Sequence, residues 1–417
     1  MAERRVPRIR FKGFEEDWEQ RKLGELADIV GGGTPSTSNL QYWDGDIDWY
    51  APAEINEQVY VSSSQKKITK AGYENSSVKL LPVGTVLFTS RAGIGKTAIL
   101  AREACTNQGF QSIVPHKQEL DSYFIFSRAA ELKRYGEIVG AGSTFVEISG
   151  KQMAEMELMM PYALGEQQAI GTYFRRLDWL ISLHQRKLEK LKILKKAMLE
   201  KMFPKNGAKV PEIRFSGFTD DWEQRKLGDF CEMYNGDRGI NYPKEPDLVP
   251  EGIPFVNAGD LQEGRVNLRD CNKITREKFN QLGGAKIQYG DILYCLRGTL
   301  GKNAYVDNFD EGTVASSLVD IRPKNIDAMY LFTILNSDIE YRQRTLNDEG
   351  AAQPNLSARN LAEFDIPIPS LKEQEAIGTF FLGLYKVISL HHRQCLTLAF
   401  HRIRRFFHGS IYPGGGF

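Results

Sequence analysis

A short stretch containing glycine and lysine offers the first candidate chemistry. Residues 88–99 read "FTSRAGIGKTAI", and "GIGKT" matches the end of the phosphate-binding pattern G-x-x-x-x-G-K-[ST]. That pattern needs its first glycine so that backbone N–H groups can surround phosphates without interference from a Cβ atom. The corresponding position is Ser90, while Gly95, Lys96 and Thr97 fit. Three matches in four fixed positions leave nucleotide binding open.

Other catalytic patterns are absent from the sequence. It contains no [ND]-P-P-[FYW], no H-E-x-x-H, no G-x-S-x-G, and no acidic strand end that would partner a phosphate-binding loop. Its five cysteines are widely spaced and form no C-x-x-C, so buried free thiols are expected rather than disulfides or a metal site. We therefore expect a binding or scaffolding subunit that holds no metal or cofactor of its own.

Length and charge limit the class of protein. The 417 residues are enough for two or more domains, at about 100–200 residues each. Lys and Arg number 54 against 53 Asp and Glu, so the chain is not basic throughout, although local basic patches are allowed. No run of about 18 apolar residues is present, and the first residues lack the apolar part of a secretory signal. A cytoplasmic protein without a membrane segment is expected.

The chain contains two copies of one sequence. The opening "VPRIRFKGFEEDWEQRKLGEL" at 6–26 returns at 210–230, with 15 of 21 positions identical, where chance would give about one or two. A later segment, 166–191, returns at 373–398 with 14 of 26 identical. The offsets of 204 and 207 define a tandem duplication. Such a repeat is too long for a solenoid and has the size of a whole domain with a connector.

The phosphate-loop-like stretch also has a second copy, "YCLRGTLGKNAY". This copy keeps the arginine and the Gly-Lys pair as Arg297 and Lys302, but it loses the Ser/Thr that would bind Mg²⁺. The shared feature is therefore predicted to be a strand followed by a tight basic turn. In that turn Arg91 and Lys96 are available to the phosphates of a nucleic acid, with structural packing of the turn as the alternative.

Each copy ends in a heptad pattern. The first seam consists of Ile170, Phe174, Leu177, Ile181, His184, Leu188, Leu191, Lys195, Met198 and Met202. More than four heptads predict a coiled-coil helix, and the 33 residues 170–202 would span roughly 50 Å. Pro204 and Gly207 predict its end.

The second tail repeats the seam with Ile377, Phe381, Leu384, Ile388, His391, Cys395 and Leu398. Arg402 and Arg405 occupy the next positions, so the second helix is expected to be shorter or to end on a partner. The two helices are expected to pair antiparallel. Their equivalent histidines, 184 and 391, are expected to be packed side chains rather than metal ligands.

Between the shared segments, short apolar runs broken by turn signals predict strands of a mixed domain. Loops rich in Gly, Ser, Thr, Asn and Gln recur at matching places, and such residues can hydrogen-bond base edges and phosphates. Any single loop is more simply an ordinary surface turn, but the recurrence favours DNA contact. The candidate DNA-binding residues are Thr34, Ser36, Arg91, Lys96, Asn107, Gln108, Ser143, Thr144, Arg238, Asn257, Arg297, Lys302, Gln353 and Asn355.

Together these motifs resemble those of the specificity subunits of type I restriction-modification systems. The marks are the repeated W-E-Q-R-K-L-G openings, "GGGTPSTSN" with "YWDGDIDW", "GAGSTF", "GAAQPNLS" and the two EQ-x-A-I-G helices. Each is weak alone, but in combination they cover nearly the whole chain. The last twenty or so residues depart from the family's pattern.

The resemblance implies an α+β fold with two mixed α/β target recognition domains in tandem, 1–164 and 206–371. Two long helices, in 165–205 and in 372–417 with its C-terminal tail, would separate them as an antiparallel coiled coil. Each domain would read one half of a split double-stranded DNA site, and the unequal variable regions imply an asymmetric target. The helices would set the gap between the half-sites.

The resemblance also implies partner subunits. Two methyltransferase subunits would dock on the helices and carry adenine-N6 methylation with S-adenosylmethionine, and restriction subunits would join through the complex with ATP and Mg²⁺. This chain would then be non-catalytic. Two alternatives remain: a coiled-coil scaffold that does not read DNA, and an ATP-binding enzyme that uses Lys96.

Overall fold

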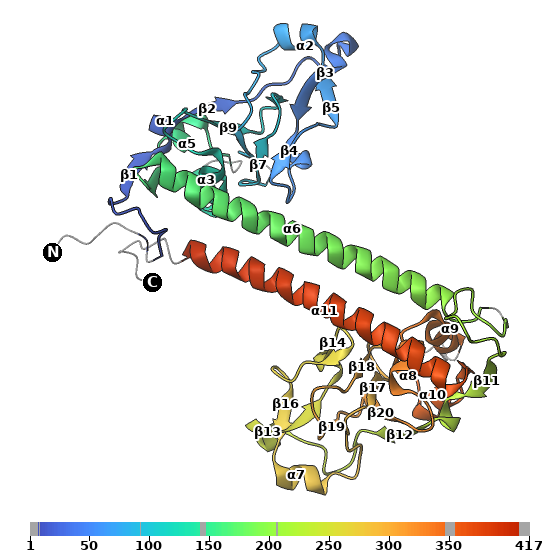
Figure 1. Cartoon of the computed structure of the whole chain (residues 1–417). Coiled ribbons are helices and arrows are strands. Elements are labelled where there is room, and N and C mark those ends of the chain that lie inside the picture. The colour runs from blue at the N-terminus through green and yellow to red at the C-terminus, as the bar shows by residue number, and fades with distance from the viewer. Residues whose placement is uncertain are drawn as a thin grey trace. The chain divides into compact units, whose positions relative to one another are not determined.

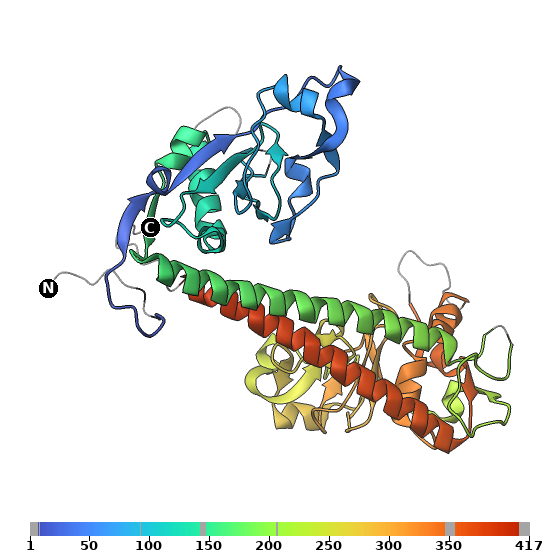
Figure 2. The ribbon, with the colours of Figure 1, turned by 45° about the horizontal axis from the view of Figure 1, so that its top comes forward.

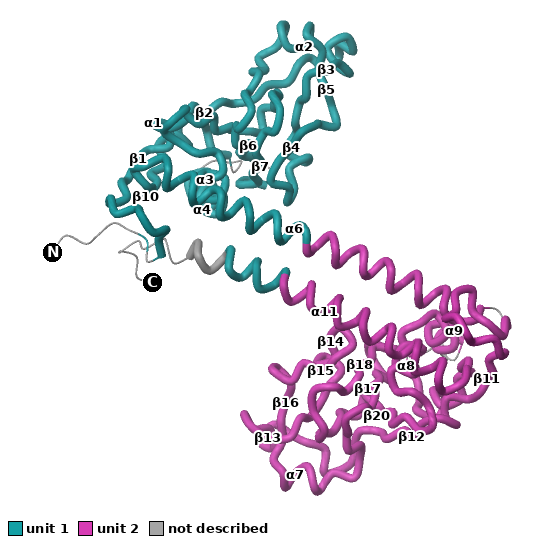
Figure 3. Tube along the Cα trace, in the orientation of Figure 1, with its two compact units in different colours: residues 1–183, 395–417 teal, residues 184–394 magenta. Residues whose placement is uncertain are grey.

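The computed structural model describes residues 9–91, 93–141, 147–205, 207–346 and 355–407, together with Pro7. The chain divides into two compact units (Figure 3). Unit 1 comprises Met1–Leu183 with Cys395–Phe417, and unit 2 comprises His184–Gln394. Each unit thus contains one sequence copy and a segment of the other copy's tail helix.

Unit 1 is a mixed domain of short strands and helices. Its strands are β1 (Glu19–Lys22), β2 (Ala27–Gly31), β3 (Trp43–Tyr50), β4 (Tyr60–Val61), β5 (Lys66–Ile68), β6 (Val86–Phe88), β7 (Thr97–Leu100), β8 (Cys105–Thr106), β9 (Gln111–Pro115) and β10 (Glu157–Met160). Its short helices are α1 (Leu23–Leu26), α2 (Lys70–Glu74), α3 (Ser122–Ser127), α4 (Ala129–Gly140) and α5 (Gly150–Ala154), with 3-10 turns at Leu40–Tyr42 and Pro52–Glu54. The sheets have the orders β2-β9-β6-β7-β4, β5-β3-β8 and β1-β10.

Unit 2 has closely similar parts. Its strands are β11 (Glu223–Lys226), β12 (Cys231–Asn235), β13 (Leu248–Val256), β14 (Leu261–Gln262), β15 (Arg265–Val266), β16 (Asn272–Ile274), β17 (Ile292–Cys295), β18 (Asn303–Tyr305), β19 (Thr313–Val314), β20 (Leu318–Pro323) and β21 (Asp365–Ile368). Its short helices are α7 (Arg276–Gln281), α8 (Ala328–Ile334), α9 (Asp338–Leu346) and α10 (Ala358–Ala362), with 3-10 turns at Leu227–Asp229, Glu245–Asp247 and Ala258–Asp260.

The two units share one topology even where their sequences differ. The order β12-β20-β17-β18 in unit 2 reproduces β2-β9-β6-β7, and β16-β13-β19 reproduces β5-β3-β8. In both three-stranded sheets the central strand pairs antiparallel with one neighbour and parallel with the other, and its register shifts near its start. A difference lies at the sheet edge, where unit 1 adds β4 and unit 2 has the β14-β15 hairpin. The variable regions are therefore two versions of one scaffold.

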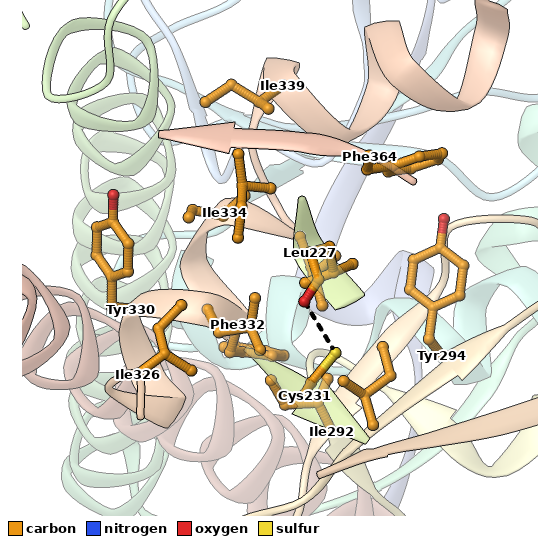
Figure 4. Packing of buried hydrophobic residues seen from close by; sticks show 14 of the residues in the cluster. Leu227, Cys231, Ile292, Tyr294, Ile326, Tyr330, Phe332, Ile334, Ile339 and Phe364 are labelled. Carbon is orange, nitrogen blue, oxygen red and sulfur yellow. Dashed lines mark hydrogen bonds between the residues drawn. The ribbon is translucent and has the colours of Figure 1, made fainter. Parts of the chain in front are cut away.

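The central strands β6 and β17 lie inside the cores. All their residues are buried, which agrees with the continuous apolar runs that predict buried strands. In unit 2 the core gathers aromatic and aliphatic side chains around Leu227, Ile292 and Phe332 (Figure 4). The Cys231 thiol donates to the Leu227 carbonyl at 3.3 Å, and all five cysteines are buried and free, as predicted. The cores thus hold fixed the strands whose ends carry the basic turns.

The repeated sequence motifs join each opening segment to its tail helix. Arg10 Nε lies 2.7 Å from Glu166 Oε1, and Arg214 forms the equivalent pair with Glu373, also at 2.7 Å. Both glutamates are almost completely buried, so charge pairing must compensate for their lost hydration. The neighbouring Gln167 accepts a hydrogen bond from the backbone at the start of α3 at 3.1 Å. These contacts explain why the EQ and R-F motifs occur twice.

The tail helices are α6 (Leu164–Lys201) and α11 (Leu371–Phe407), with 38 and 37 residues. In unit 2 they run antiparallel, because His184 of α6 contacts His391 and the later Lys195 contacts the earlier Tyr385 (Figures 1 and 2). The two imidazole Nδ1 atoms lie 2.8 Å apart, and burial next to His184 lowers the pKa of His391. Among the described residues, no three His, Cys, Asp or Glu side chains are placed to share a metal ion.

The second helix was expected to be shorter or to end on a partner, but at 37 residues it is nearly as long as the first, which has 38. Where the apolar seam gives way to arginine, Arg402 forms an ion pair with Asp178 of α6 at 2.7 Å within unit 1. The hydroxyl of Tyr123 on α3 donates to the same carboxylate at 2.8 Å. A charge pair thus replaces the apolar contact that the heptad pattern predicts, and the helix continues.

Most predicted seam residues face the interior of a unit. Leu177, Leu188, Ile377, Phe381 and Leu384 are buried, and Ile170, Phe174, Ile181, Leu191 and Ile388 are partly buried. No helix of the described part of the chain is long and apolar enough to cross a lipid bilayer.

Candidate nucleic-acid interface

The stretch that resembles a phosphate-binding loop is a closed turn between two strands. After β6, the backbone N–H of Thr89 donates to the Lys96 carbonyl at 3.0 Å, and Gly95 donates back to the Thr89 carbonyl at 3.0 Å. Gly95 has φ of +94°, and a Cβ there would lie 2.3 Å from the Lys133 side chain, so the turn requires glycine. Thr97 then begins strand β7, whereas a phosphate-binding loop leads into a helix. This stretch therefore does not form the phosphate-binding loop that the alternative of an ATP site at Lys96 requires.

Unit 2 has the same turn between β17 and β18. Cys295 donates to the Lys302 carbonyl at 2.8 Å, and Gly301, with φ of +80°, donates to the Cys295 carbonyl at 3.2 Å. The prediction of a strand followed by a tight basic turn is confirmed in both copies. Both copies preserve a closed turn that carries an arginine and a lysine, Arg91 and Lys96 in unit 1 and Arg297 and Lys302 in unit 2.

In unit 1 this turn joins three other segments. The Ser90 N–H donates to the Gly109 carbonyl at 2.8 Å, and the Ser90 carbonyl accepts from Ile148 at 3.1 Å. The hydroxyl of Thr34 donates to the side-chain oxygen of Gln108. We call the resulting surface rim 1, composed of the described residues 33–36, 89–91, 93–96, 107–110 and 147–148.

Unit 2 repeats the arrangement with different side chains. Leu296 donates to the Ser317 carbonyl at 2.9 Å and accepts from the Leu356 N–H at 3.0 Å. Arg238 Nη2 donates to the Ser316 carbonyl at 3.3 Å, in the place where Thr34 meets Gln108 in unit 1. We call this surface rim 2, composed of 236–238, 295–302, 315–317 and 355–356.

Glycine allows the close approach of backbones at each rim. A Cβ on Gly32 would lie 1.9 Å from the Asn107 carbonyl oxygen, and one on Gly236 would lie 2.4 Å from the Ala315 carbonyl oxygen. Real Cβ atoms do not come so close, so these two positions can hold only glycine without moving the backbone. This requirement explains Gly32 of "GGGTPSTSN" and Gly236 of "NGDRG".

Many of the predicted DNA-binding residues lie on the two rims. Rim 1 contains Thr34, Ser36, Arg91, Lys96, Asn107 and Gln108, and rim 2 contains Arg238, Arg297, Lys302 and Asn355. Arg297 Nε donates to Asn355 Oδ1 at 3.2 Å, which brings two separately predicted residues together. Asn257 lies beside rim 2, since the Ala315 N–H donates to the neighbouring Val256 carbonyl at 2.8 Å. Ser143, Thr144 and Gln353 lie outside the described residues.

The rims carry cations that are not neutralised by the protein. Within the described residues, Arg91, Lys96, Arg238 and Arg297 have no acidic side chain within ion-pair distance. Lys96, Arg238 and Arg297 are exposed, and Arg91 is partly exposed. Each rim therefore carries two surface cations without an acidic partner, a pattern that is typical of a site for a polyanion.

Two predicted contact residues have internal partners. Lys302 Nζ donates to the Ala258 carbonyl at 2.9 Å, and Asn257 Nδ2 donates to the Phe255 carbonyl at 3.2 Å. Both side chains therefore stabilise the loop after β13. Asn107 is similar, because its Oδ1 accepts from the Gly109 N–H at 2.8 Å.

The sequence reasoning missed two rim residues. Glu147 forms an isolated β-bridge with Arg91, as Asn355 does with Arg297, and Ser316 accepts from Arg238. The repeat itself could have revealed them, but the offset between the copies is 204 at the opening, 208 at β9 and β20 and 207 in the tail helices, so one fixed offset does not align them.

The fold consists of two units of one topology, each with a rim of exposed cations, and two long helices that contribute to both units. The family model described as "Type I restriction modification DNA specificity domain" matches residues 15–193 and again 219–398. The chain is 32% identical over 263 residues to the type I restriction enzyme MjaIX specificity subunit of Methanocaldococcus jannaschii, covering 60% of this chain and 59% of that one. It is 29% identical over 180 residues to the Escherichia coli EcoR124I/EcoR124II specificity subunit, covering 41% and 43%.

A solved structure shows the same fold. The S subunit of a type I restriction-modification system from M. genitalium superposes with a TM-score of 0.67 at 15% identity, over 98% of this chain and 100% of that one. The matched stretches span 59% and 43% of the two curated relatives. Because the family model covers most of the chain in two copies, the chain belongs to the family of type I restriction-modification DNA specificity subunits.

Proposed function

We propose that each unit reads one half of a bipartite double-stranded DNA site through its rim. The observation that carries this proposal is the recurrence of one four-segment rim with unpaired cations in both units. Arg and Lys on a rim bind backbone phosphates and fix register, while Asn, Gln, Ser and Thr can reach base edges. Joining two modest readers in one chain raises effective concentration, so tight binding requires both halves.

The target is asymmetric under this proposal. At equivalent rim positions unit 1 places Thr34 with Gln108, whereas unit 2 places Arg238 with Ser316. Arginine favours guanine in the major groove, while an amide favours adenine. Two rims with different donors and acceptors would therefore select different bases.

The paired helices are proposed to set the gap and to dock two methyltransferase subunits. They expose large apolar side chains, namely Trp179 and Leu396 in unit 1, and Ile193, Leu194 and Leu390 in unit 2. Exposed apolar residues gathered on a helix pair are typical of a protein-binding surface.

The chemistry of the complex is assigned to its partners. Adenine-N6 methylation with S-adenosylmethionine would belong to the methyltransferase subunits, and ATP- and Mg²⁺-dependent cleavage to restriction subunits. This chain would act in the cytoplasm as a non-catalytic reader.

Methylome sequencing tests the proposal. A host that expresses this chain with its cognate methyltransferase subunit should methylate one motif with two unequal half-sites and a fixed gap. The same host with the methyltransferase subunit alone should leave that motif unmethylated. An identical methylation pattern with and without this chain would overturn the proposal.

A binding measurement separates DNA reading from a pure scaffold. Gel shifts of the assembled complex on target and scrambled duplexes should show a preference of at least about a thousandfold at physiological salt. Equal affinity for both duplexes across a salt series would favour the scaffold.

A further inference from the structure

The two most exposed large aliphatic side chains among the described residues are Leu40 and Ile240, at 83% and 92% exposure. A single exposed aliphatic residue needs no special explanation. These two, however, lie in corresponding loops of the two units, which lead from β2 to β3 and from β12 to β13. Leu40 lies in the 3-10 turn directly before β3, and Ile240 lies five residues before the 3-10 turn that precedes β13. The loop sequences differ, so an exposed aliphatic tip is what the two loops share.

The Leu40 loop is held in place on both sides of its tip. Trp43 Nε1 donates to the Ser36 carbonyl at 3.1 Å, and the Thr69 hydroxyl donates to the Gln41 carbonyl at 2.7 Å. The Trp43 ring also packs edge-on against Trp49, with centroids 5.1 Å apart. Leu40 therefore projects from a fixed turn rather than from a loosely attached one.

The Ile240 loop is anchored by different contacts. Asp237 accepts from the Gly239 N–H at 3.1 Å and from the Gly283 N–H at 2.9 Å. On the other side of the tip, the Tyr242 ring packs against Phe255 with centroids 5.5 Å apart. Two unrelated sets of anchors thus produce the same projecting aliphatic tip.

The surroundings of the tips favour DNA over a protein partner. Ser36 of rim 1 lies in the Leu40 loop, and the unpaired Arg238 of rim 2 lies two residues before Ile240. Neither loop contains another exposed aliphatic or aromatic residue, whereas the core of a protein interface is a contiguous apolar patch. A lone apolar side chain on an otherwise polar loop matches the wedges that proteins insert between base pairs.

We propose that Leu40 and Ile240 are wedge residues that insert at a base step, one in each half-site. The proposal rests on the DNA-reading function proposed above. Each tip would partly unstack one step, while rim cations hold the flanking phosphates. Local unstacking would also lower the free energy of extruding an adenine, which a methyltransferase must take out of the stack.

Truncation of each tip tests the proposal in the assembled complex with its methyltransferase subunits. Duplexes carrying the methylome-defined site receive 2-aminopurine at successive positions, because its fluorescence rises on unstacking. Wild type should raise the signal at one step in each half-site. Leu40→Ala should abolish the rise in one half-site only, Ile240→Ala in the other only, and each should weaken specific binding roughly tenfold.

Val83→Ala and Tyr289→Ala are the matched controls. Both residues are exposed, at 61% and 65%, and precede β6 and β17 at the strand ends away from the rims. If the tip variants behave like these controls while wild type still prefers its target, the wedge assignment alone is overturned. If wild type shows no preference for the target, the proposed function fails with it.

Discussion

At the scale of single residues, aligned buried positions of the two units hold different polar side chains. Strand β20 of unit 2 buries Asp320 completely, where the aligned strand β9 of unit 1 carries Ser112. The Arg322 guanidinium contacts Asp291 at 2.8 Å but lies 3.6 Å from Asp320. Burial and the neighbouring Asp291 charge raise the pKa of Asp320 to about 8. Folding of unit 2 therefore favours the protonated form of the Asp320 carboxyl.

This raised pKa predicts an unusual pH dependence of stability. The folded state binds the Asp320 proton more tightly than the unfolded state, whose pKa is about 3.9. Stability of unit 2 should therefore decrease as the pH rises from about 4 to 8, by up to about 1.4 kcal/mol per pH unit. Asp320→Asn should flatten this dependence in urea unfolding measured between pH 5 and 8. Asp310→Asn, at an exposed carboxylate, serves as control, and an unchanged slope in Asp320→Asn would contradict the prediction.

The exposed cations of the rims give a second prediction at this scale. Arg297→Ala and Lys96→Ala should each weaken DNA binding several-fold on all sequences and reduce the slope of log affinity against log salt by about 0.9, if each contacts one phosphate. Lys117→Ala is the matched control, because that exposed lysine follows β9 at the strand end away from rim 1. Fluorescence anisotropy at several salt concentrations measures this slope. A slope equal to that of wild type would show that the substituted residue contacts no phosphate.

At the scale of elements, equivalent positions on the two helices hold different polar contacts. In unit 1, Asp178 of α6 pairs with Arg402 of α11. In unit 2, the equivalent residues are Tyr385 of α11 and Lys195 of α6, and the ammonium lies 4.7 Å from the ring centroid. Burial raises the pKa of Asp178 and lowers the pKa of Lys195, so both contacts partly offset the loss of hydration.

The Asp178 pair predicts strong coupling between two helices within unit 1. Asp178→Asn should lower the free energy of unfolding of unit 1 by about 2 kcal/mol, less than for a fully buried pair because Arg402 is 39% exposed. The double variant Asp178→Leu/Arg402→Met should recover most of this loss, since an apolar pair restores the heptad seam. Thermal unfolding of the full chain measures both. The exposed Lys70–Glu74 pair is the control, with an expected effect below about 0.5 kcal/mol.

Local sequence patterns predicted the helices and turns well, but they did not predict which strands pair with one another. The heptads predicted both long helices, and the duplicated "GK" stretch predicted the turn after β6 and β17, because these signals lie within one segment. The three-stranded sheets around Trp49 and Phe255 have matching topology but no matching sequence. Strand pairing joins residues far apart in the chain, and side chains on such strands vary freely as long as their alternation is kept. The continuation of α11 past Arg402 could not be predicted from the heptad pattern, because it depends on the ion pair with Asp178, which is distant in the sequence.

At the scale of the whole molecule, the duplication gives the chain two copies of one scaffold, and its two long helices belong to both units. Helix α6 begins in unit 1 at Leu164 and ends in unit 2 at Lys201. Helix α11 begins in unit 2 at Leu371 and ends in unit 1 at Phe407. A change in helix length therefore alters the connection between the two rims without changing either rim. The proposed gap between half-sites should respond to helix length alone.

Insertion into both helices tests this relation. Four residues added after Leu191 and four after Ile388 would lengthen each helix by about 6 Å, close to two base pairs at about 3.4 Å each. Methylome sequencing should then show both half-sites unchanged and the gap longer by about two base pairs. An insertion after Leu191 alone is the control, because it shifts the seam of one helix against its partner and should reduce methylation instead. An unchanged gap in cells that still methylate would show that the helices do not measure the distance between half-sites.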